Sequence, residues 1–255
     1  MKMLKKERNS VTKNLAIIFA GGVGSRMGEP SLPKQFIEVY DKPVLIWTLE
    51  CFEQHPQIDE IYLACKEEWI DHTKTLLVEF NINKVKTIVP GGETAQHSIY
   101  NALIEARGNN TEDAIVLIHD GVRPLITEKL ITNLIEMTKA AGNAITCTPC
   151  HETIIVNDDE DTVSNVPIRR HTFAAQAPQA FFLGDIINAH DEMRRNNPDY
   201  RDVVDACTLY HLLGQKINMV TGNLDNIKVT MPEDVFIFKA LLKHRASKET
   251  LSSSH

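Results

Sequence analysis

The chain has 255 residues, of which 43% are apolar and 24% are charged, and this composition suits one ordinary globular domain with a large core. Its net charge of −7 argues against a broad surface for nucleic acid or membrane, although a local basic pocket remains compatible with it. The sequence contains no run of about 18 apolar residues, which argues against a membrane-spanning helix.

The two ends of the chain differ in composition from the rest. Residues 1–13 are polar and basic and lack the apolar centre of a signal peptide, so we expect a flexible leader. We expect a single domain over residues 14–245 and a disordered tail over residues 246–255, which ends in serines and a histidine.

Five cysteines are scattered along the chain, an odd number that is typical of reduced thiols and predicts a cytoplasmic protein. Cys147 and Cys150 have the C-x-x-C spacing of redox and zinc sites. They close a predicted strand instead of opening a helix, and the sequence contains no second C-x-x-C pair. We therefore interpret these two cysteines as structural.

A glycine-rich turn follows the first predicted strand, the apolar run over residues 15–20. Gly21, Gly22 and Gly24 lie in this turn, and backbone N–H groups of such a turn can approach an anion closely. A surface turn without a ligand is the plain alternative. The combination of an apolar strand, clustered glycines and nearby cations favours phosphate binding.

The cations are Arg26 and Lys34, which supply full positive charges near the turn. The turn does not match the dinucleotide fingerprint, because Met27 stands where that motif needs its last glycine. It does not match the P-loop either, because Gly28 is followed by Glu29 and not by lysine. The sequence therefore predicts a nucleotide that is bound in another kind of cradle.

Strands and helices alternate through residue 149. The predicted strands cover residues 15–20, 60–65, 86–89, 114–118 and 144–149, and the predicted helices cover residues 43–53, 69–80, 98–106 and 128–141. This alternation predicts an α/β fold with a mostly parallel sheet, and the continuous apolar strands predict helices on both faces. Such folds bind ligands at the carboxyl ends of the strands, where the glycine turn, Gly91–Gly92 and residues 119–123 would share one cleft.

The alternation stops after residue 149. Residues 153–157 and 162–166 predict a hairpin with an acidic turn, part of a β-arm over about residues 150–172. A two-stranded ribbon is marginally stable alone, so we expect the arm to project and to pack against a second subunit. Helices are predicted over residues 184–195, 203–213 and 232–243, with a strand over residues 217–220.

Three side chains suggest chemistry at the predicted cleft. Asp120 ends a buried strand, where a carboxylate can hold Mg²⁺ that is shared with phosphates, or can cap a turn. Arg123 can bind a phosphate bidentately or form a surface ion pair. Lys228 lies in an alternating segment that could face the cleft or a sheet edge. Asp120 and Asp225 are the predicted metal ligands.

We interpret His119 as a core histidine, and we find no Ser/His/Asp triad and no histidine-rich metal site in the sequence. Cations and a carboxylate without a nucleophile suggest phosphoryl transfer directly between two substrates. Such catalysis rests on positioning and on neutralisation of charge.

Five motifs in this order resemble the sugar-alcohol-phosphate cytidylyltransferases, and the similarity covers about residues 15–242. The family has a methylerythritol-phosphate branch and a ribitol-5-phosphate branch. The motifs are Ala20-Gly-Gly-Val-Gly-Ser-Arg-Met-Gly28, Leu32-Pro-Lys-Gln-Phe36, His119-Asp-Gly-Val-Arg-Pro124, Gln176-Ala-Pro-Gln179 and Asp225-Asn-Ile-Lys-Val-Thr230.

This resemblance implies a Rossmann-like nucleotidyltransferase fold, Mg²⁺, and a homodimer with exchanged β-arms. It implies transfer of CMP from CTP to a sugar-alcohol phosphate, with release of pyrophosphate, and no nucleic-acid or membrane partner. By resemblance, the catalytic residues are Arg26, Lys34 and Lys228. The nucleotide-binding residues are Ala20, Gly21, Gly22, Gly24, Gly92, Ser98 and Asp120. The substrate-binding residues are Arg123, Thr153 and Arg169, and the last two would reach the site of the other subunit.

The chain departs from the family pattern at Ala177, where threonine is frequent, and at Ala95, where arginine is usual. Both departures bear on the acceptor more than on the reaction. Residues 32–36 and 166–171 resemble the ribitol branch, whereas residues 225–234 resemble the methylerythritol branch. We expect D-ribitol 5-phosphate as the acceptor, with 2-C-methyl-D-erythritol 4-phosphate as the alternative.

Two other functional classes fit the sequence less well. A nucleotide-dependent oxidoreductase would use a similar sheet, but the failed dinucleotide fingerprint argues against it. A nucleotide sensor without catalysis would bind CTP tightly, but the combination of Asp120, Arg123 and Lys228 argues against it.

Overall fold

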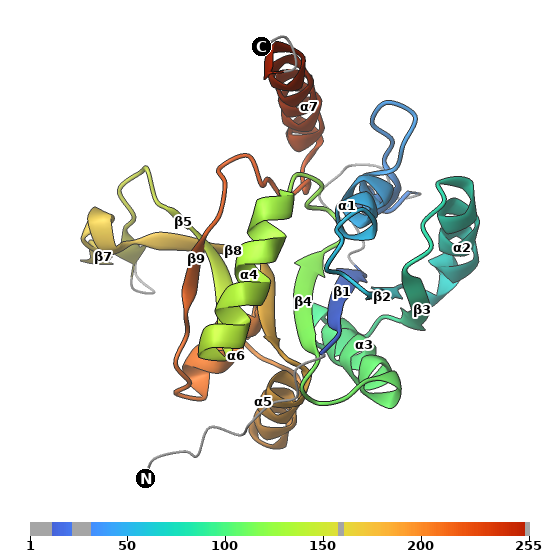
Figure 1. The fold of residues 1–255 in the computed structure, drawn as a ribbon. Coiled ribbons are helices and arrows are strands. Elements are labelled where there is room, and N and C mark those ends of the chain that lie inside the picture. Colours follow the sequence, from blue (N-terminus) through green and yellow to red (C-terminus); the bar gives the residue numbers. More distant parts are fainter. Residues whose placement is uncertain (1–11, 22–31, 158–160, 253–255) are drawn as a thin grey trace.

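A sheet with helices on both faces forms the body of the molecule (Figure 1). The computed structural model describes residues 12–21, 32–157 and 161–252. Within these ranges the sheet has seven strands, in the order β3-β2-β1-β4-β8-β5-β9. The strands are β1 (Asn14–Ala20), β2 (Glu60–Cys65), β3 (Val85–Pro90), β4 (Ile115–Asp120), β5 (Asn143–Pro149), β8 (Phe173–Phe182) and β9 (Met219–Thr221).

All neighbouring strands are parallel except at β8, which lies antiparallel between β4 and β5. The predicted mostly parallel sheet is therefore confirmed. The register places Phe19 beside Asp120, and Ala20 beside Cys65. The carboxyl ends of β1, β2 and β4 consequently meet at one edge of the sheet.

Helices cover the two faces because each strand alternates its side chains between them. In β1, Ala16 and Ile18 belong to one core cluster, and Leu15 and Ile17 belong to the other. The first face carries α1 (Val44–Glu53), α2 (Ile70–Glu79) and α4 (Glu128–Ala141), and the second face carries α3 (Ala95–Asn109), α5 (Leu183–Asn196) and α6 (Ala206–Leu212).

The residues at the two ends of α4 are of types that commonly begin and end helices. The Thr127 side chain accepts a hydrogen bond from the backbone N–H of Leu130 and caps the first turn. Gly142 ends the helix with φ +95°, a conformation that favours glycine. The predicted limits of this helix are confirmed.

The strand β8 is not among the strands that the sequence predicts. Its ladder with β5 shifts register between Ile145, paired with Gln179, and Thr146, paired with Gln176. Ala177 and Pro178, joined by a cis peptide bond, lie in this shift. Proline has no N–H for a ladder and weakens a strand pattern, so the strand is recognisable only from its long-range pairing.

The last helix, α7 (Pro232–Ser252), extends from the body at the top of Figure 1. Near its start, Phe238 packs edge-on against Trp47, with ring centroids 5.9 Å apart. The helix continues to Ser252, whereas the sequence analysis places a disordered tail from residue 246. Neither glycine nor proline follows Pro232 within it. In the described ranges, no helix has both the length and the apolar content needed to cross a bilayer.

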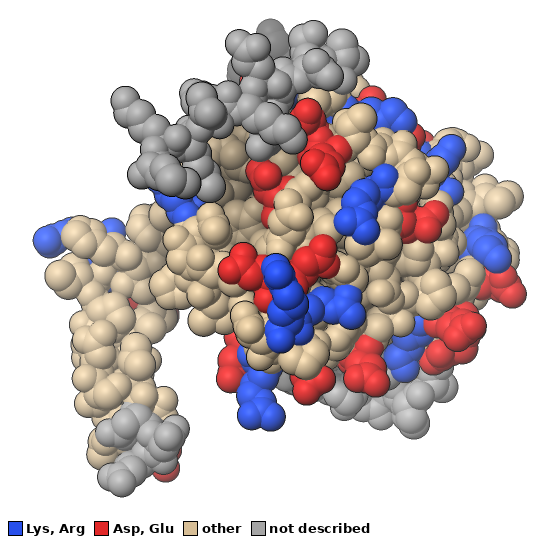
Figure 2. All heavy atoms as spheres, turned by 90° about the horizontal axis from the view of Figure 1, so that it is seen from below, with Lys and Arg blue, Asp and Glu red and all other residues tan. Residues whose placement is uncertain are grey.

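The predicted hairpin is confirmed as β6 (Val156–Asn157) and β7 (Val163–Asn165), which pair antiparallel. It projects from the body at the left of Figure 1. Figure 2 shows this projection as a mostly uncharged column, whereas both signs of charge are scattered over the body. Its exposed apolar side chains include Ile155 at 60% and Val163 at 55%. The arm thus presents apolar surface that its own hairpin leaves uncovered.

Two histidines, His119 at the end of β4 and His190 in α5, are fully buried. One ring nitrogen of His119 lies 3.0 Å from the carbonyl oxygen of Arg123, and one of His190 lies 2.8 Å from the Tyr200 hydroxyl. Burial lowers the pKa of His119 to about 4 and the pKa of His190 to about 3. The predicted core role of His119 agrees with this environment.

Because the unfolded chain takes up protons below a histidine pKa of about 6.5 while the folded chain does not, acid should destabilise the fold. We expect the free energy of unfolding to fall between pH 6.5 and 4 by ~1.4 kcal/mol per pH unit for each histidine. Urea denaturation at several pH values measures this slope. His190→Gln keeps a polar side chain but cannot titrate, so it should make the slope shallower and leave the part that comes from His119 and from His55, whose pKa burial also lowers. An unchanged slope in this variant would contradict the lowered pKa of His190 in the folded protein.

Candidate active site

A cavity of about 270 Å³ opens at the carboxyl edge of the sheet. Its walls come from the ends of β1 and β4, from the start of α3, and from the 3₁₀ turn η1 (Lys34–Phe36). The lining residues include Ala20, Gly21, Lys34, Gln35, Gly92, Thr94, Ser98, Asp120 and Lys228. The structure thus brings together the described residues to which the sequence analysis assigns nucleotide binding and catalysis. Gly22, Gly24 and Arg26 lie outside the described residues.

Glycine backbone forms one wall of this cavity. The Ser98 hydroxyl accepts a hydrogen bond from Gly92 N–H and donates one to the Thr94 carbonyl, each at 3.0 Å. A Cβ atom at Gly92 would lie 2.3 Å from the Cβ of His97, and one at Gly21 would lie 3.2 Å from the Ser98 hydroxyl. The site therefore requires bare backbone there, next to the N terminus of α3, which favours anions.

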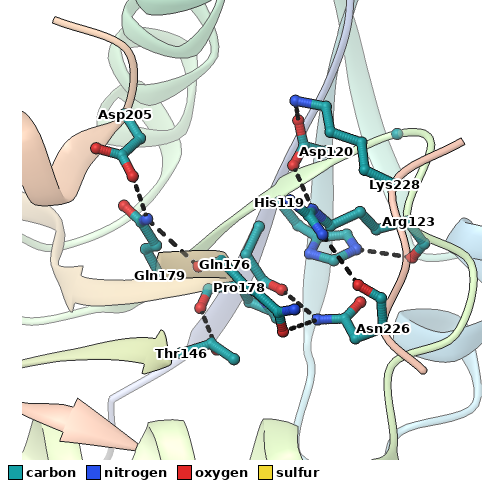
Figure 3. A network of polar contacts seen from close by, with 12 residues as sticks. His119, Asp120, Arg123, Thr146, Gln176, Pro178, Gln179, Asp205, Asn226 and Lys228 are labelled. Carbon is teal, nitrogen blue, oxygen red and sulfur yellow. Dashed lines mark hydrogen bonds and ion pairs between the residues drawn. The ribbon is translucent and has the colours of Figure 1, made fainter. Parts of the chain in front are cut away.

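Asp120 forms the charged centre of the site (Figure 3). One carboxylate oxygen lies 2.6 Å from Lys228 Nζ, and the other accepts a hydrogen bond from Arg123 Nε at 2.8 Å. Burial opposes ionisation of Asp120, but the positive charges of Lys228 and Arg123 outweigh burial and lower the pKa of the carboxyl below its ordinary value. Asp120 therefore remains ionised and holds two cations in place.

The Arg123 guanidinium is fixed from a second side. Its Nη1 donates a hydrogen bond to the backbone carbonyl of Asn226 at 2.9 Å. The buried Asn226 amide in turn donates to the carbonyl of Ala177 at 2.8 Å. These contacts connect β4, the segment that carries Lys228, and the irregular part of β8.

A second cavity of about 240 Å³ adjoins the first and shares Phe19, Ala95, Asp120 and Lys228 with it. The residues that line only this second cavity include Arg123, Gln176, Ala177, Gln179, Val204 and Asp205. The predicted substrate residue Arg123 and both residues that depart from the family pattern, Ala95 and Ala177, thus lie at this cavity.

A hydrogen-bond network makes part of the second cavity rigid (Figure 3). Gln179 Nε2 donates to Asp205 at 2.9 Å, and Gln179 Oε1 accepts from the backbone N–H of Cys207 at 2.9 Å. Asp205 also caps α6 by accepting from Thr208 N–H. The sequence analysis does not assign Asp205 to the site. The motif over residues 176–179 does contain both glutamines.

Three predicted site residues lie elsewhere. Thr153 and Arg169 are exposed residues of the arm region and do not line either cavity within this chain. Asp225 does not line them either, because its carboxylate accepts hydrogen bonds from Arg245 at 2.7 Å and from Asn223. The structure thus does not bring Asp225 to the cavities that Asp120 lines, and its role as a metal ligand stays a prediction.

The described residues contain no group of three or more His, Cys, Asp or Glu side chains arranged to hold a metal. Mg²⁺ commonly binds through one or two carboxylates together with phosphate oxygens of a substrate. Asp120, which lines both cavities, fits that mode of binding.

The site has the parts for transfer between two bound molecules. Lys228 and Arg123 contact Asp120, and Lys34 adds a positive charge to the wall of the first cavity, so the site suits anionic substrates. The Ser98 hydroxyl, which lies in the first cavity, is hydrogen-bonded to the backbone of Gly92 and of Thr94. The α/β sheet, the glycine wall and these cations at the carboxyl edge define a nucleotide-dependent transferase with a Rossmann-like fold.

Comparison with known proteins agrees with this class. The chain belongs to the family described as IspD, 2-C-methyl-D-erythritol 4-phosphate cytidylyltransferase, whose model matches residues 14–244. A ribitol-5-phosphate cytidylyltransferase of Vibrio parahaemolyticus is 47% identical over 229 residues, which are 90% of this chain and 95% of the relative. A 2-C-methyl-D-erythritol 4-phosphate cytidylyltransferase of Clostridium botulinum is 35% identical over 233 residues, which are 91% of this chain and 99% of the relative.

The crystal structure of 4-diphosphocytidyl-2C-methyl-D-erythritol synthase from Anaerococcus prevotii superposes with a TM-score of 0.78 at 29% identity. It covers 91% of this chain and 96% of its own chain. The fold and the family that the sequence motifs predict are therefore confirmed, and with them the class of CTP-dependent cytidylyltransferases.

Replacing Gly92 by alanine should impair the glycine wall, because the new Cβ would meet His97 at 2.3 Å. We expect Gly92→Ala to weaken CTP binding at least tenfold, roughly the effect of 1.4 kcal/mol, in isothermal titration calorimetry. Gly108→Ala, also in the α3 region, is the matched control, since its Cβ would meet nothing within 4 Å. That change should leave CTP binding intact and stabilise the helix by up to about 1 kcal/mol. Wild-type affinity in Gly92→Ala would show that bare backbone is unnecessary there.

Proposed function

We propose that this enzyme transfers CMP from CTP to D-ribitol 5-phosphate and releases pyrophosphate, forming CDP-ribitol. The observation that carries the proposal is the junction of two cavities at Asp120 and Lys228. One cavity has the bare backbone and cations that suit a nucleoside triphosphate. The other has a rigid polar wall and Arg123, which suit a polyol that carries a phosphate.

In the first cavity, CTP would lie along Ala20, Gly21 and Gly92, with Ser98 near its base and ribose. Lys34 and Arg26 would hold the triphosphate. Lys228, whose side chain is 40% exposed beside the buried Asp120, would reach the α-phosphate from the junction. This arrangement leaves the α-phosphorus open toward the second cavity.

The chemical step is direct. An oxygen of the acceptor phosphate attacks the α-phosphorus of CTP, the bond to the bridging oxygen of the β-phosphate breaks, and pyrophosphate leaves with that electron pair. The attacking oxygen is already ionised, so no protein base is needed. Lys228 would stabilise charge on the transferring phosphoryl group, and Arg123 would orient the acceptor phosphate.

We assign Mg²⁺ to Asp120 together with the triphosphate oxygens, because Asp120 is the ionised carboxylate at the junction. When bound, Mg²⁺ would neutralise phosphate charge. Asp225 takes no part in this assignment, since it lines neither cavity.

Ribitol 5-phosphate is favoured as the acceptor because the ribitol-named relative shares 47% identity, against 35% for the methylerythritol-named relative. The second candidate is 2-C-methyl-D-erythritol 4-phosphate, which the description of the matched family favours. Ala177 lies in the wall of the second cavity, so the residue at this position can bear on the choice of acceptor.

We further propose that the enzyme is a homodimer in which each arm completes the site of the other subunit. Supporting this, the arm exposes Ile155, Val163 and Ile168 at 60%, 55% and 58%. An isolated two-stranded ribbon gains little stability alone, so a partner surface would bury these side chains. Arg169 would then add a cation for the acceptor phosphate.

A cytoplasmic location is part of the same proposal. All five cysteines lie in described ranges and carry free thiols, as expected in a reducing compartment. Neither nucleic acid nor membrane is needed for the proposed reaction.

The reaction is tested by pyrophosphate release from CTP with ribitol 5-phosphate, methylerythritol 4-phosphate or glycerol 3-phosphate as acceptor. We expect the highest kcat/KM with ribitol 5-phosphate. Lys34→Ala and Lys228→Ala should each lower kcat by about 100- to 1000-fold, because a charge that stabilises the transferring phosphate is lost. Lys139→Ala, which removes an exposed surface lysine paired with Glu136, should retain wild-type turnover. No turnover with any acceptor, or normal turnover in both site variants, would refute the proposal.

Arm exchange is tested by mixing Arg169→Ala subunits with Lys228→Ala subunits, each nearly inactive alone. A mixed dimer has one intact site, made of Lys228 from one subunit and Arg169 from the other. With random pairing, we expect about a quarter of wild-type activity, because half of the dimers are mixed and each has one working site. Mixed dimers without recovered activity would show that the arm does not act in the partner's site.

A further inference from the structure

Gln35 occupies an unusual position in the first cavity. It is 1% exposed and lies on the turn η1 beside Lys34, yet it lines the cavity. Its amide nitrogen donates a hydrogen bond to the carbonyl oxygen of Ala20 at 2.7 Å. Because that carbonyl can only accept, the nitrogen must face Ala20, and the orientation of the whole amide follows.

The other end of this amide lacks a partner. No residue in the described ranges donates a hydrogen bond to Gln35 Oε1, although the atom is buried. A buried acceptor without a donor is unfavourable, and such groups in folded proteins are nearly always satisfied. Because Gln35 lines the first cavity, the unsatisfied acceptor on this side chain suggests that a ligand bound there supplies the donor.

The surroundings also keep Gln35 in place. The next residue, Phe36, packs against Trp69 and His72, with ring centroids 5.0 and 4.9 Å away. Phe36 is itself 3% exposed. The turn is thus anchored on one side by this aromatic cluster and on the other by Ala20, so Oε1 is held in position before a ligand arrives.

We propose that Gln35 Oε1 accepts a hydrogen bond from the cytidine part of CTP and makes Gln35 a specificity-determining residue. This inference rests on the proposed function, which places CTP in this cavity. Triphosphate oxygens are acceptors and cannot satisfy Oε1. The donors that cytidine offers are the 4-amino group of the base and the ribose hydroxyls.

A nucleotide that lacks this donor leaves Oε1 unsatisfied, and one that presents an acceptor adds repulsion. UTP has a carbonyl oxygen in place of the 4-amino group, and the 2′-deoxy and 3′-deoxy forms of CTP each lack one hydroxyl. Sites built around such a buried polar group discriminate strongly against ligands without the matching group. We expect wild-type enzyme to bind CTP about 10- to 100-fold more tightly than one of these three analogues.

The test is calorimetric binding of CTP, UTP, 2′-deoxy-CTP and 3′-deoxy-CTP, without any acceptor, to wild-type enzyme and to Gln35→Met. Methionine matches glutamine in length but removes the oxygen. In Gln35→Met, we expect the preference for CTP over the discriminated analogue to fall at least fivefold, corresponding to most of one lost hydrogen bond. If the preference for CTP over UTP is lost, the donor to Oε1 is the 4-amino group. If the preference for CTP over a deoxy analogue is lost, the donor is the ribose hydroxyl that this analogue lacks.

Gln57→Met is the matched control, since Gln57 also has a buried oxygen without a donor in the described residues and lines neither cavity. It should leave all affinity ratios unchanged. Equal weakening of all four nucleotides in Gln35→Met would overturn the inference and assign Gln35 a purely structural role.

If Gln35→Met fails to fold, the wild-type measurements can still overturn the inference. Equal affinity of wild-type enzyme for all four nucleotides overturns the inference but leaves the proposed reaction intact. Failure of wild-type enzyme to bind CTP refutes the proposed reaction itself, so the two failures are distinguishable.

Discussion

The site depends on one buried carboxylate that is held between two cations. Asp120 lies at the end of the central strand β4, where burial alone would favour its neutral form, and Lys228 and Arg123 keep it charged. Removing one partner would leave a buried charge poorly compensated, which is costly in proteins. Because Asp120 lines both cavities, the same three charges set where the two substrates of the proposed reaction would meet.

The antiparallel strand β8 explains how distant segments reach this point. Since β8 runs against its neighbours, its irregular part at Ala177 lies near the carboxyl end of β4, and its first residue, Phe173, pairs with Pro149 at the carboxyl end of β5. The chain between β5 and β8, which forms the arm, therefore leaves and re-enters the sheet at the edge that carries the site. An arm that starts there is suitably placed to contact the same edge of a second copy.

Local patterns predicted the strands and helices through residue 149, and the rule that parallel strands bind ligands at their carboxyl ends correctly brought Gly92 and Asp120 together. Long-range pairings were not predictable in this way. The partner of Asp225 is Arg245, which lies twenty positions later on α7. The continuation of α7 past Ala246 was also not predictable, because the local sequence there does not distinguish a helix from a disordered tail. The partnerless oxygen of Gln35 likewise becomes visible only once the cavity and its neighbours are known.

The junction of the two cavities has a consequence for how acceptor preference can diverge. A substitution at Asp120, Lys228 or Ala95 changes both binding regions at once. Substitutions at residues such as Gln176 or Val204 reach only the second cavity, so they can reshape it while the nucleotide wall stays unchanged. Under the proposed function, this division would let the acceptor region change separately from the nucleotide region, and relatives of this chain are named for different sugar-alcohol phosphates.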